Sequence, residues 1–222
     1  MTTPLQTIEL DPGVPAAATI IVLHGLGADG TDFLPFGDEI DLSAIGPVRW
    51  VLPRASVRPV TINNGYKMRA WYDILGTDLQ RTEDEAGLRE SFAQVHALIE
   101  REVARGVPAR RIVLAGFSQG CAITLGGGLR CPHRLAGLAG MSGYLPLADS
   151  TAAERHAANA GVPVFQAHGQ RDGIVPLARG AAARDALKGL GLDVEWHDYP
   201  MEHSVCAEEV QHLKSWLLRV LQ

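Results

Sequence analysis

The segment AGFSQGCA, residues 115–122, places Ser118 between Gly116 and Gly120. The pattern G-x-S-x-G is typical of a serine displayed on a sharp turn between a strand and a helix, where its hydroxyl can act as a nucleophile. In a chain with 24 glycines the pattern alone is weak, and it counts only in that context. The alternative is that Ser118 merely caps the N-terminus of a helix, a frequent role of serine.

A serine hydroxyl needs a base to take its proton and an acid to orient the base. When the three groups stand on loops at the carboxyl ends of parallel strands, their usual order along the chain is serine, acid, histidine. Of the eight histidines, His203 fits this order best, because it follows the last predicted strand. Asp172, in HGQRDGIVP, also follows a predicted strand. Glu202 competes as the acid, but side chains of adjacent residues diverge, so we favour Asp172.

The developing negative charge of an acyl-transfer reaction requires two N–H donors, which form an oxyanion hole. Gln119, directly after the serine, supplies one backbone N–H. The glycine-rich segment HGLGADGTDF, residues 24–33, favours Leu26 as the second donor. A phosphate-binding loop is the rival interpretation, but the segment matches neither common phosphate-binding glycine pattern.

Short apolar runs alternate with helical patterns, and these elements must position the candidate groups. Strands are predicted at 19–25, 48–53, 111–116, 135–143, 163–169 and 193–200, with an edge strand at 7–10. Helices are predicted at 83–105, 119–130, 177–190 and 205–221. The alternation predicts an α/β fold with a mostly parallel central sheet and helices on both faces. We see no linker or repeat and expect residues 1–222 to form a single domain.

Residues 53–82 lack a strong helical or strand period. A connection of this length in a compact domain is usually functional. It is rich in apolar and aromatic side chains, which predicts a lid-like segment that forms part of an apolar substrate site. The residues expected to contact the substrate are Met68, Trp71, Ile74 and Leu75.

Taken together, the motifs resemble the carboxylesterase, lysophospholipase and acyl-protein thioesterase family of α/β-hydrolases. The similarity extends over nearly the whole chain through HGLGADGTDF, PVTINNGYKMRAWYD, AGFSQGCA, HGQRDGIVP and YPMEHSVCAEE. It implies an α/β-hydrolase fold without a large cap domain, a triad of Ser118, Asp172 and His203, and an oxyanion hole at Leu26 and Gln119. Two residues depart from the family pattern, because Cys121 and Glu202 stand where glycine is common.

Composition narrows the function classes further. The net charge is −5 and the basic residues are scattered, which argues against a nucleic-acid surface. No N-terminal signal or membrane-spanning run is apparent. The odd count of three cysteines lacks metal-ligand spacing, so we expect reduced thiols in a cytoplasmic protein. No metal, cofactor or stable membrane insertion is expected, and a homodimer is left open.

The leading hypothesis is a serine hydrolase that cleaves carboxylic esters or thioesters through an acyl-enzyme, with a small-molecule or acylated ester as substrate. Acyl-protein thioesterase or lysophospholipase activity is the alternative within the same chemistry. The alternative from another class is a non-catalytic binding protein on the same fold, which would be expected to lack one of the catalytic groups.

Overall fold

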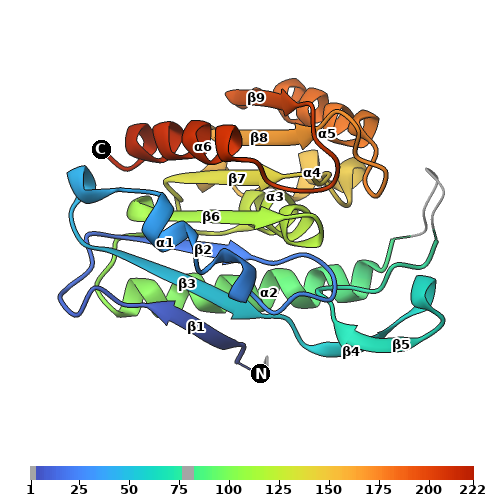
Figure 1. The fold of residues 1–222 in the computed structure, drawn as a ribbon, viewed down its shortest axis with the longest axis horizontal. Helices are drawn as coiled ribbons and strands as arrows, with labels where there is room; N and C mark the ends of the chain where they lie inside the picture. The colour runs from blue at the N-terminus through green and yellow to red at the C-terminus, as the bar shows by residue number, and fades with distance from the viewer. Residues whose placement is uncertain (1–3, 77–82) are drawn as a thin grey trace.

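A seven-stranded sheet forms the centre of the computed structural model, which describes residues 4–76 and 83–222 (Figure 1). Its strands are β1 (Gln6–Leu10), β2 (Ala18–Leu23), β3 (Val48–Arg54), β6 (Ile112–Phe117), β7 (Gly137–Met141), β8 (Val164–Gly169) and β9 (Val194–Tyr199). Their order across the sheet is β1-β3-β2-β6-β7-β8-β9. Only β1 runs antiparallel to its neighbour, at the edge of the sheet. The predicted mostly parallel sheet and edge strand are therefore confirmed.

Helices cover both faces of this sheet (Figure 1). The α-helices are α1 (Phe36–Glu39), α2 (Glu85–Ala104), α3 (Gln119–Arg130), α4 (Ala148–Glu154), α5 (Leu177–Gly189) and α6 (Ala207–Val220). Helices α2, α3 and α5 pack on one face, and α1 and α6 pack on the other. The four long helices agree with the predicted ranges, whereas the short α1 and α4 were not predicted because they have too few turns to show a period. Among the described helices, none combines the length and apolar character needed to cross a membrane.

The two hydrophobic cores follow from the alternation of side chains along each strand. In β2, Ile21 and Leu23 belong to the core under α2 and α3, whereas Ile20 and Val22 belong to the core under α1 and α6. A strand buried on both faces is apolar at nearly every position, which explains the continuous apolar runs of the sequence.

Part of the segment 53–82 forms regular structure that the sequence analysis did not predict. Strands β4 (Val57–Val60) and β5 (Tyr66–Arg69) pair as an antiparallel hairpin outside the main sheet. Asn64 and Gly65 both have positive φ values, 55° and 73°, at the turn. An Asn-Gly pair is a strong hairpin signal because both residues tolerate this conformation, and it was the available clue. Residues 77–82 of the segment lie outside the described residues.

Candidate active site

The candidate nucleophile stands on the turn between β6 and α3. Ser118 has φ 57° and ψ −116°, a conformation that residues other than glycine rarely adopt. Its side chain makes no capping hydrogen bond to α3, so the alternative role as a simple helix cap does not hold. Strained backbone of this kind is characteristic of functional sites, where it aims a side chain away from the helix that follows.

The two flanking glycines are required by the close approach of backbone at this turn. A Cβ atom on Gly116 would lie 2.3 Å from the carbonyl oxygen of Gly120. A Cβ atom on Gly120 would lie 2.1 Å from the carbonyl oxygen of Leu23, at the end of the neighbouring strand β2. Neither contact can be relieved by rotating a side chain. The spacing G-x-S-x-G is therefore a packing requirement of the turn that presents Ser118.

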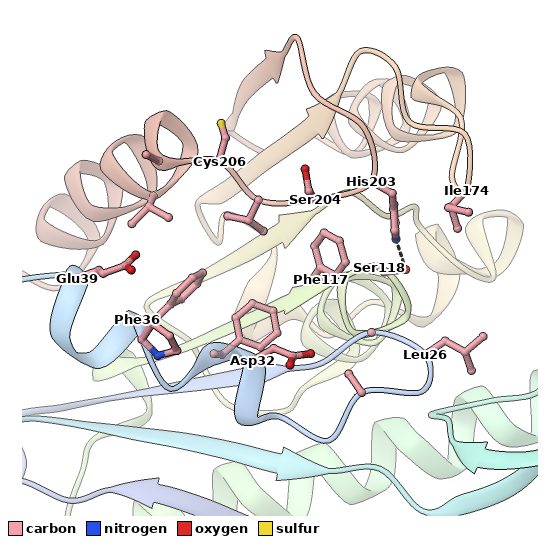
Figure 2. Close-up of a pocket in the computed structure, with 17 residues that line it drawn as sticks. Leu26, Asp32, Phe36, Glu39, Phe117, Ser118, Ile174, His203, Ser204 and Cys206 are labelled. Atoms are coloured by element: carbon pink, nitrogen blue, oxygen red, sulfur yellow. Dashed lines mark hydrogen bonds between the residues drawn. The ribbon is translucent and has the colours of Figure 1, made fainter.

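Three loops at the carboxyl edge of the sheet bring the predicted triad residues together. Ser118 follows β6, Asp172 follows β8 and His203 follows β9. The Nε2 atom of His203 lies 2.9 Å from Ser118 Oγ, and its Nδ1 atom lies 2.7 Å from Asp172 Oδ2 (Figure 2 shows the His203–Ser118 contact). Because an ionised carboxylate only accepts hydrogen bonds, Nδ1 carries the proton and Nε2 is free to accept one from the serine.

The Asp172 carboxylate is held in place by the backbone of its own loop. Its Oδ1 atom accepts hydrogen bonds from the N–H groups of Ile174, at 2.9 Å, and Val175, at 2.8 Å. Its side chain is fully buried. A neighbouring imidazole, His168, lies 3.5 Å from Oδ2, and burial lowers the pKa of His168, which favours its neutral form. The negative charge of Asp172 is therefore directed at His203.

Glu202 has a different environment from Asp172. Its residue is exposed, and the acidic partner of His203 is Asp172. The Glu202 backbone packs closely against Gly169, where a Cβ atom would lie 2.3 Å from the Glu202 carbonyl oxygen. The structure therefore agrees with the argument that adjacent side chains diverge.

The two predicted oxyanion-hole donors lie on segments next to Ser118. Leu26 lies in the loop after β2 and Gln119 is the first residue of α3. Among the described residues, neither N–H has a hydrogen-bond partner, so both are free to bind an oxygen atom. The loop carrying Leu26 is tied to the hairpin, since Gly27 N–H donates to the Arg69 carbonyl at 2.9 Å. Free N–H donors are what an oxyanion hole requires, and that Leu26 and Gln119 form one stays a prediction.

Two further side chains support the site, and the sequence analysis did not identify these roles. The Phe117 ring packs against the His203 imidazole, with ring centroids 4.7 Å apart. The buried Gln119 side chain accepts from Trp71 N–H at 3.0 Å and donates to the Tyr72 carbonyl at 2.8 Å. Gln119 thus links the nucleophile helix to the segment after the hairpin. The only available signal was the position of both residues beside Ser118.

A cavity of about 740 Å³ opens beside Ser118 and His203 (Figure 2). It lies between the α1 region and the chain that leads from His203 into α6. Its walls are largely apolar and include Phe33, Phe36, Phe117, Val205 and Val210. The acidic residues that line it are Asp32 and Glu39. Within the described residues, no group of three histidine, cysteine or acidic side chains is arranged to hold a metal ion.

None of the four residues predicted to contact substrate lines this cavity. Trp71 is 1% exposed and its indole N–H donates to the His24 carbonyl at 2.9 Å, so the prediction for Trp71 is wrong. A buried indole needs such a partner, which turns the ring away from solvent. Met68 lies beside the turn at Gly27. Ile74 and Leu75 line a separate small hollow next to Tyr72. For these three, substrate contact stays a prediction.

Cys121 is accommodated by two glycines in and just after strand β7. A Cβ atom on Gly143 would lie 2.4 Å from Cys121 Cβ, and one on Gly140 would lie 2.7 Å from its Sγ. Burial raises the pKa of the Cys121 thiol well above its usual value, so the thiol is neutral and does not compete with Ser118 as a nucleophile.

Comparisons with known proteins agree with this geometry. Residues 7–221 match the family model described as Phospholipase/Carboxylesterase. The chain is 40% identical to acyl-protein thioesterase 1 of Mycosarcoma maydis over 98% of both chains, and 38% identical to that of Schizosaccharomyces pombe over 94% of this chain and 93% of the relative. The crystal structure of Arabidopsis thaliana SOBER1 has a TM-score of 0.88 at 33% identity, covering 92% of this chain and 99% of that one.

Zea mays acyl-protein thioesterase 2 is similarly close in structure, with a TM-score of 0.87 at 28% identity, covering 98% of this chain and 99% of that one. The family match over residues 7–221 includes all three loops that carry Ser118, Asp172 and His203. The chain therefore belongs to the phospholipase/carboxylesterase family of α/β-hydrolases.

Proposed function

We propose that this protein is a serine hydrolase that cleaves carboxylic esters and thioesters through an acyl-enzyme. The observation that carries the proposal is the continuous hydrogen-bonded line from Asp172 through His203 to Ser118, with distances of 2.7 and 2.9 Å. The two free N–H groups of Leu26 and Gln119 beside this line support it. A non-catalytic binding protein would have no need for a strained serine with both partners in place.

In the first half-reaction, Ser118 Oγ attacks the carbonyl carbon while its proton passes to His203 Nε2. The carbonyl oxygen becomes an oxyanion and accepts hydrogen bonds from the Leu26 and Gln119 N–H groups. When the carbon–oxygen or carbon–sulfur bond breaks, Nε2 returns its proton to the departing atom. Asp172 keeps the Nδ1 proton in place and stabilises the charged imidazolium.

In the second half-reaction, a water molecule attacks the acyl carbon and gives its proton to His203 Nε2. A second oxyanion forms in the same pair of N–H groups. The bond to Ser118 Oγ then breaks, the carboxylic acid leaves, and Nε2 returns the proton to the serine. The cycle needs no group beyond those of this chain and water.

Thioesters belong among the substrates because the chemistry of the site is indifferent to whether oxygen or sulfur leaves. The names of the relatives, acyl-protein thioesterase 1, favour a thioester on a protein as the physiological case. A cytoplasmic location fits the three cysteines, all of which are free thiols.

The experiment that tests the proposal combines activity with active-site labelling. Wild type should hydrolyse p-nitrophenyl acetate and butyryl thioesters, and Ser118→Ala should lose at least three orders of magnitude in kcat while its circular dichroism spectrum stays unchanged. A fluorophosphonate probe should modify wild type at Ser118 alone. Modification at Cys121 or at another serine, or full activity of Ser118→Ala, would show that Ser118 is not the nucleophile.

A further inference from the structure

We infer that the cavity between the α1 region and the start of α6 binds the leaving group, and that Asp32 and Glu39 select leaving groups that carry a positive charge. The inference rests on the proposed hydrolase function and names the substrate class of the same site.

The position of the cavity relative to the base identifies which half of the substrate it receives. The departing atom must lie next to His203 Nε2, because that atom returns the proton to it. One wall of the cavity is the chain that continues directly from the base, through His203, Ser204, Val205 and Cys206, into α6. A group that leaves toward the base therefore enters this cavity, while the acyl group stays on Ser118.

The walls combine aromatic rings with unpaired carboxylates. Phe33 and Phe36 form an edge-to-face pair with centroids 5.0 Å apart, and Phe117 lies against the His203 ring. Asp32 and Glu39 are exposed and line the cavity, and within the described residues neither forms a salt bridge. Aromatic faces and carboxylates are the two groups that bind alkylammonium ions.

Among the described residues that line the cavity there is no lysine or arginine, so none of these neutralises Asp32 or Glu39. The opposing contribution is the N-terminus of α6, whose first residue, Ala207, is part of the wall. A helix N-terminus is equivalent to about half a positive charge. Two full negative charges exceed it, so the cavity favours cations. In Figure 2, Glu39 lies toward one side of the view and Ser118 with His203 toward the other, so the charge of Glu39 acts on the part of the leaving group that is farther from the base.

The test varies the charge of the leaving group while the acyl group stays the same. Acetylthiocholine carries a trimethylammonium group on its thiol, 3,3-dimethylbutyl thioacetate is its neutral isostere, and the acetyl thioester of 2-mercaptoethanesulfonate is anionic. At low salt, wild type should show kcat/KM in the order cationic, neutral, anionic. Each of Asp32→Asn and Glu39→Gln should reduce the cationic-to-neutral ratio by about threefold, as expected for one charge that acts in a partly aqueous cavity. Added salt should reduce the ratio of wild type.

The matched control is Asp38→Asn, which removes the same charge from the residue next to Glu39 but does not line the cavity. It should leave the ratio unchanged. The double change Asp32→Lys/Glu39→Lys should invert the preference, so that the anionic thioester becomes the better substrate.

A cationic-to-neutral ratio near one in wild type, or a ratio that none of these variants changes, would overturn the inference although the neutral thioester is still hydrolysed. If the charge of the acyl group, varied on a common thiol, shifted kcat/KM in the same variants instead, the cavity would be the acyl site. Failure to hydrolyse any of the three thioesters would refute the proposed function itself, and the inference with it.

Discussion

At the scale of single residues, the site depends on which carboxylate orients His203. Asp172 and Glu202 are both near in the chain or in space, yet only Asp172 accepts from His203 Nδ1, at 2.7 Å. The second oxygen of Asp172 is fixed by the backbone N–H groups of Ile174 and Val175. The loop therefore determines not only where the carboxylate lies but which of its two oxygens faces the base.

This fixation makes a specific prediction for Asp172→Asn. The amide oxygen will keep the two backbone hydrogen bonds, because the N–H groups of Ile174 and Val175 need an acceptor, and this turns the amide NH₂ toward His203 Nδ1. Nδ1 must then accept, and the ring proton moves to Nε2, which can no longer take the proton of Ser118. We expect kcat for p-nitrophenyl acetate at pH 8 to fall by about 10⁴-fold.

The control for this change is Glu202→Gln, which removes an exposed carboxylate next to the base. Its kcat should stay within a few-fold of wild type, because Glu202 does not contact the imidazole. If Glu202→Gln lost more activity than Asp172→Asn, Glu202 would be the orienting acid in solution.

At the scale of secondary-structure elements, α6 has two roles, since its first turn lines the cavity and also buries an acid. Glu209 is fully buried in this turn, and among the described residues neither carboxylate oxygen accepts a well-aligned hydrogen bond, the Cys206 backbone N–H being a weak neighbour. Burial raises the pKa of Glu209 from 4.5 to about 8. The carboxyl group is therefore mostly protonated at neutral pH in the folded protein.

The raised pKa predicts that Glu209 lowers stability as pH rises. In the unfolded chain the group ionises near pH 4.5, whereas the folded protein keeps it protonated until about pH 8. Between these values the unfolded state binds fewer protons, so the free energy of unfolding falls with pH. Relative to wild type, Glu209→Gln should gain stability from pH 4.5 upward, on the order of 4 kcal/mol by pH 8, and the gain should level off above that pH.

Urea unfolding of both proteins at pH 4, 6 and 8 measures this difference. Glu208→Gln is the matched control, because Glu208 lies in the same turn but is exposed. A Glu209→Gln difference that does not depend on pH would mean that the carboxyl group reaches solvent or a partner in the folded state.

Several elements could be predicted from the sequence. Local periodicity predicts the long helices and the strands of the main sheet. Ser118, Asp172 and His203 could be identified because each follows a predicted strand. The cavity does not, because its walls join Phe33 and Phe36 to Val210, residues from elements that are far apart in the chain. Trp71 was misassigned for a related reason, since apolar composition cannot distinguish a pocket wall from a buried anchor.

At the scale of the whole molecule, the two ends of the parallel strands have different roles. The loops at the carboxyl ends hold the catalytic site, whereas a network of charges lies at the amino ends, where β2 and β3 begin and α2 ends. The fully buried Glu102 accepts from Thr19 at 3.1 Å, from Arg49 at 2.9 Å and from Arg105 at 2.9 Å. The two arginines also pair with Asp11, which follows β1. This network joins three strands and one helix at a distance from the chemistry.

Because of this separation, breaking the network should affect stability and leave catalysis intact. Glu102→Ala leaves Arg49, whose side chain is 7% exposed, as a buried cation that has lost one of its two acidic partners. Removing one member of a buried ion pair costs about 3–5 kcal/mol, and the remaining contact to Asp11 places the expected loss toward the lower end. Urea unfolding should show this loss, whereas kcat for p-nitrophenyl acetate at 20 °C should stay within twofold of wild type.

The control is the double change Arg49→Met/Glu102→Leu, which leaves neither of these two charges buried without its partner and should recover most of the lost stability. A fall in kcat at unchanged stability would show that the two ends of the parallel strands are coupled, contrary to the separation argued from the structure.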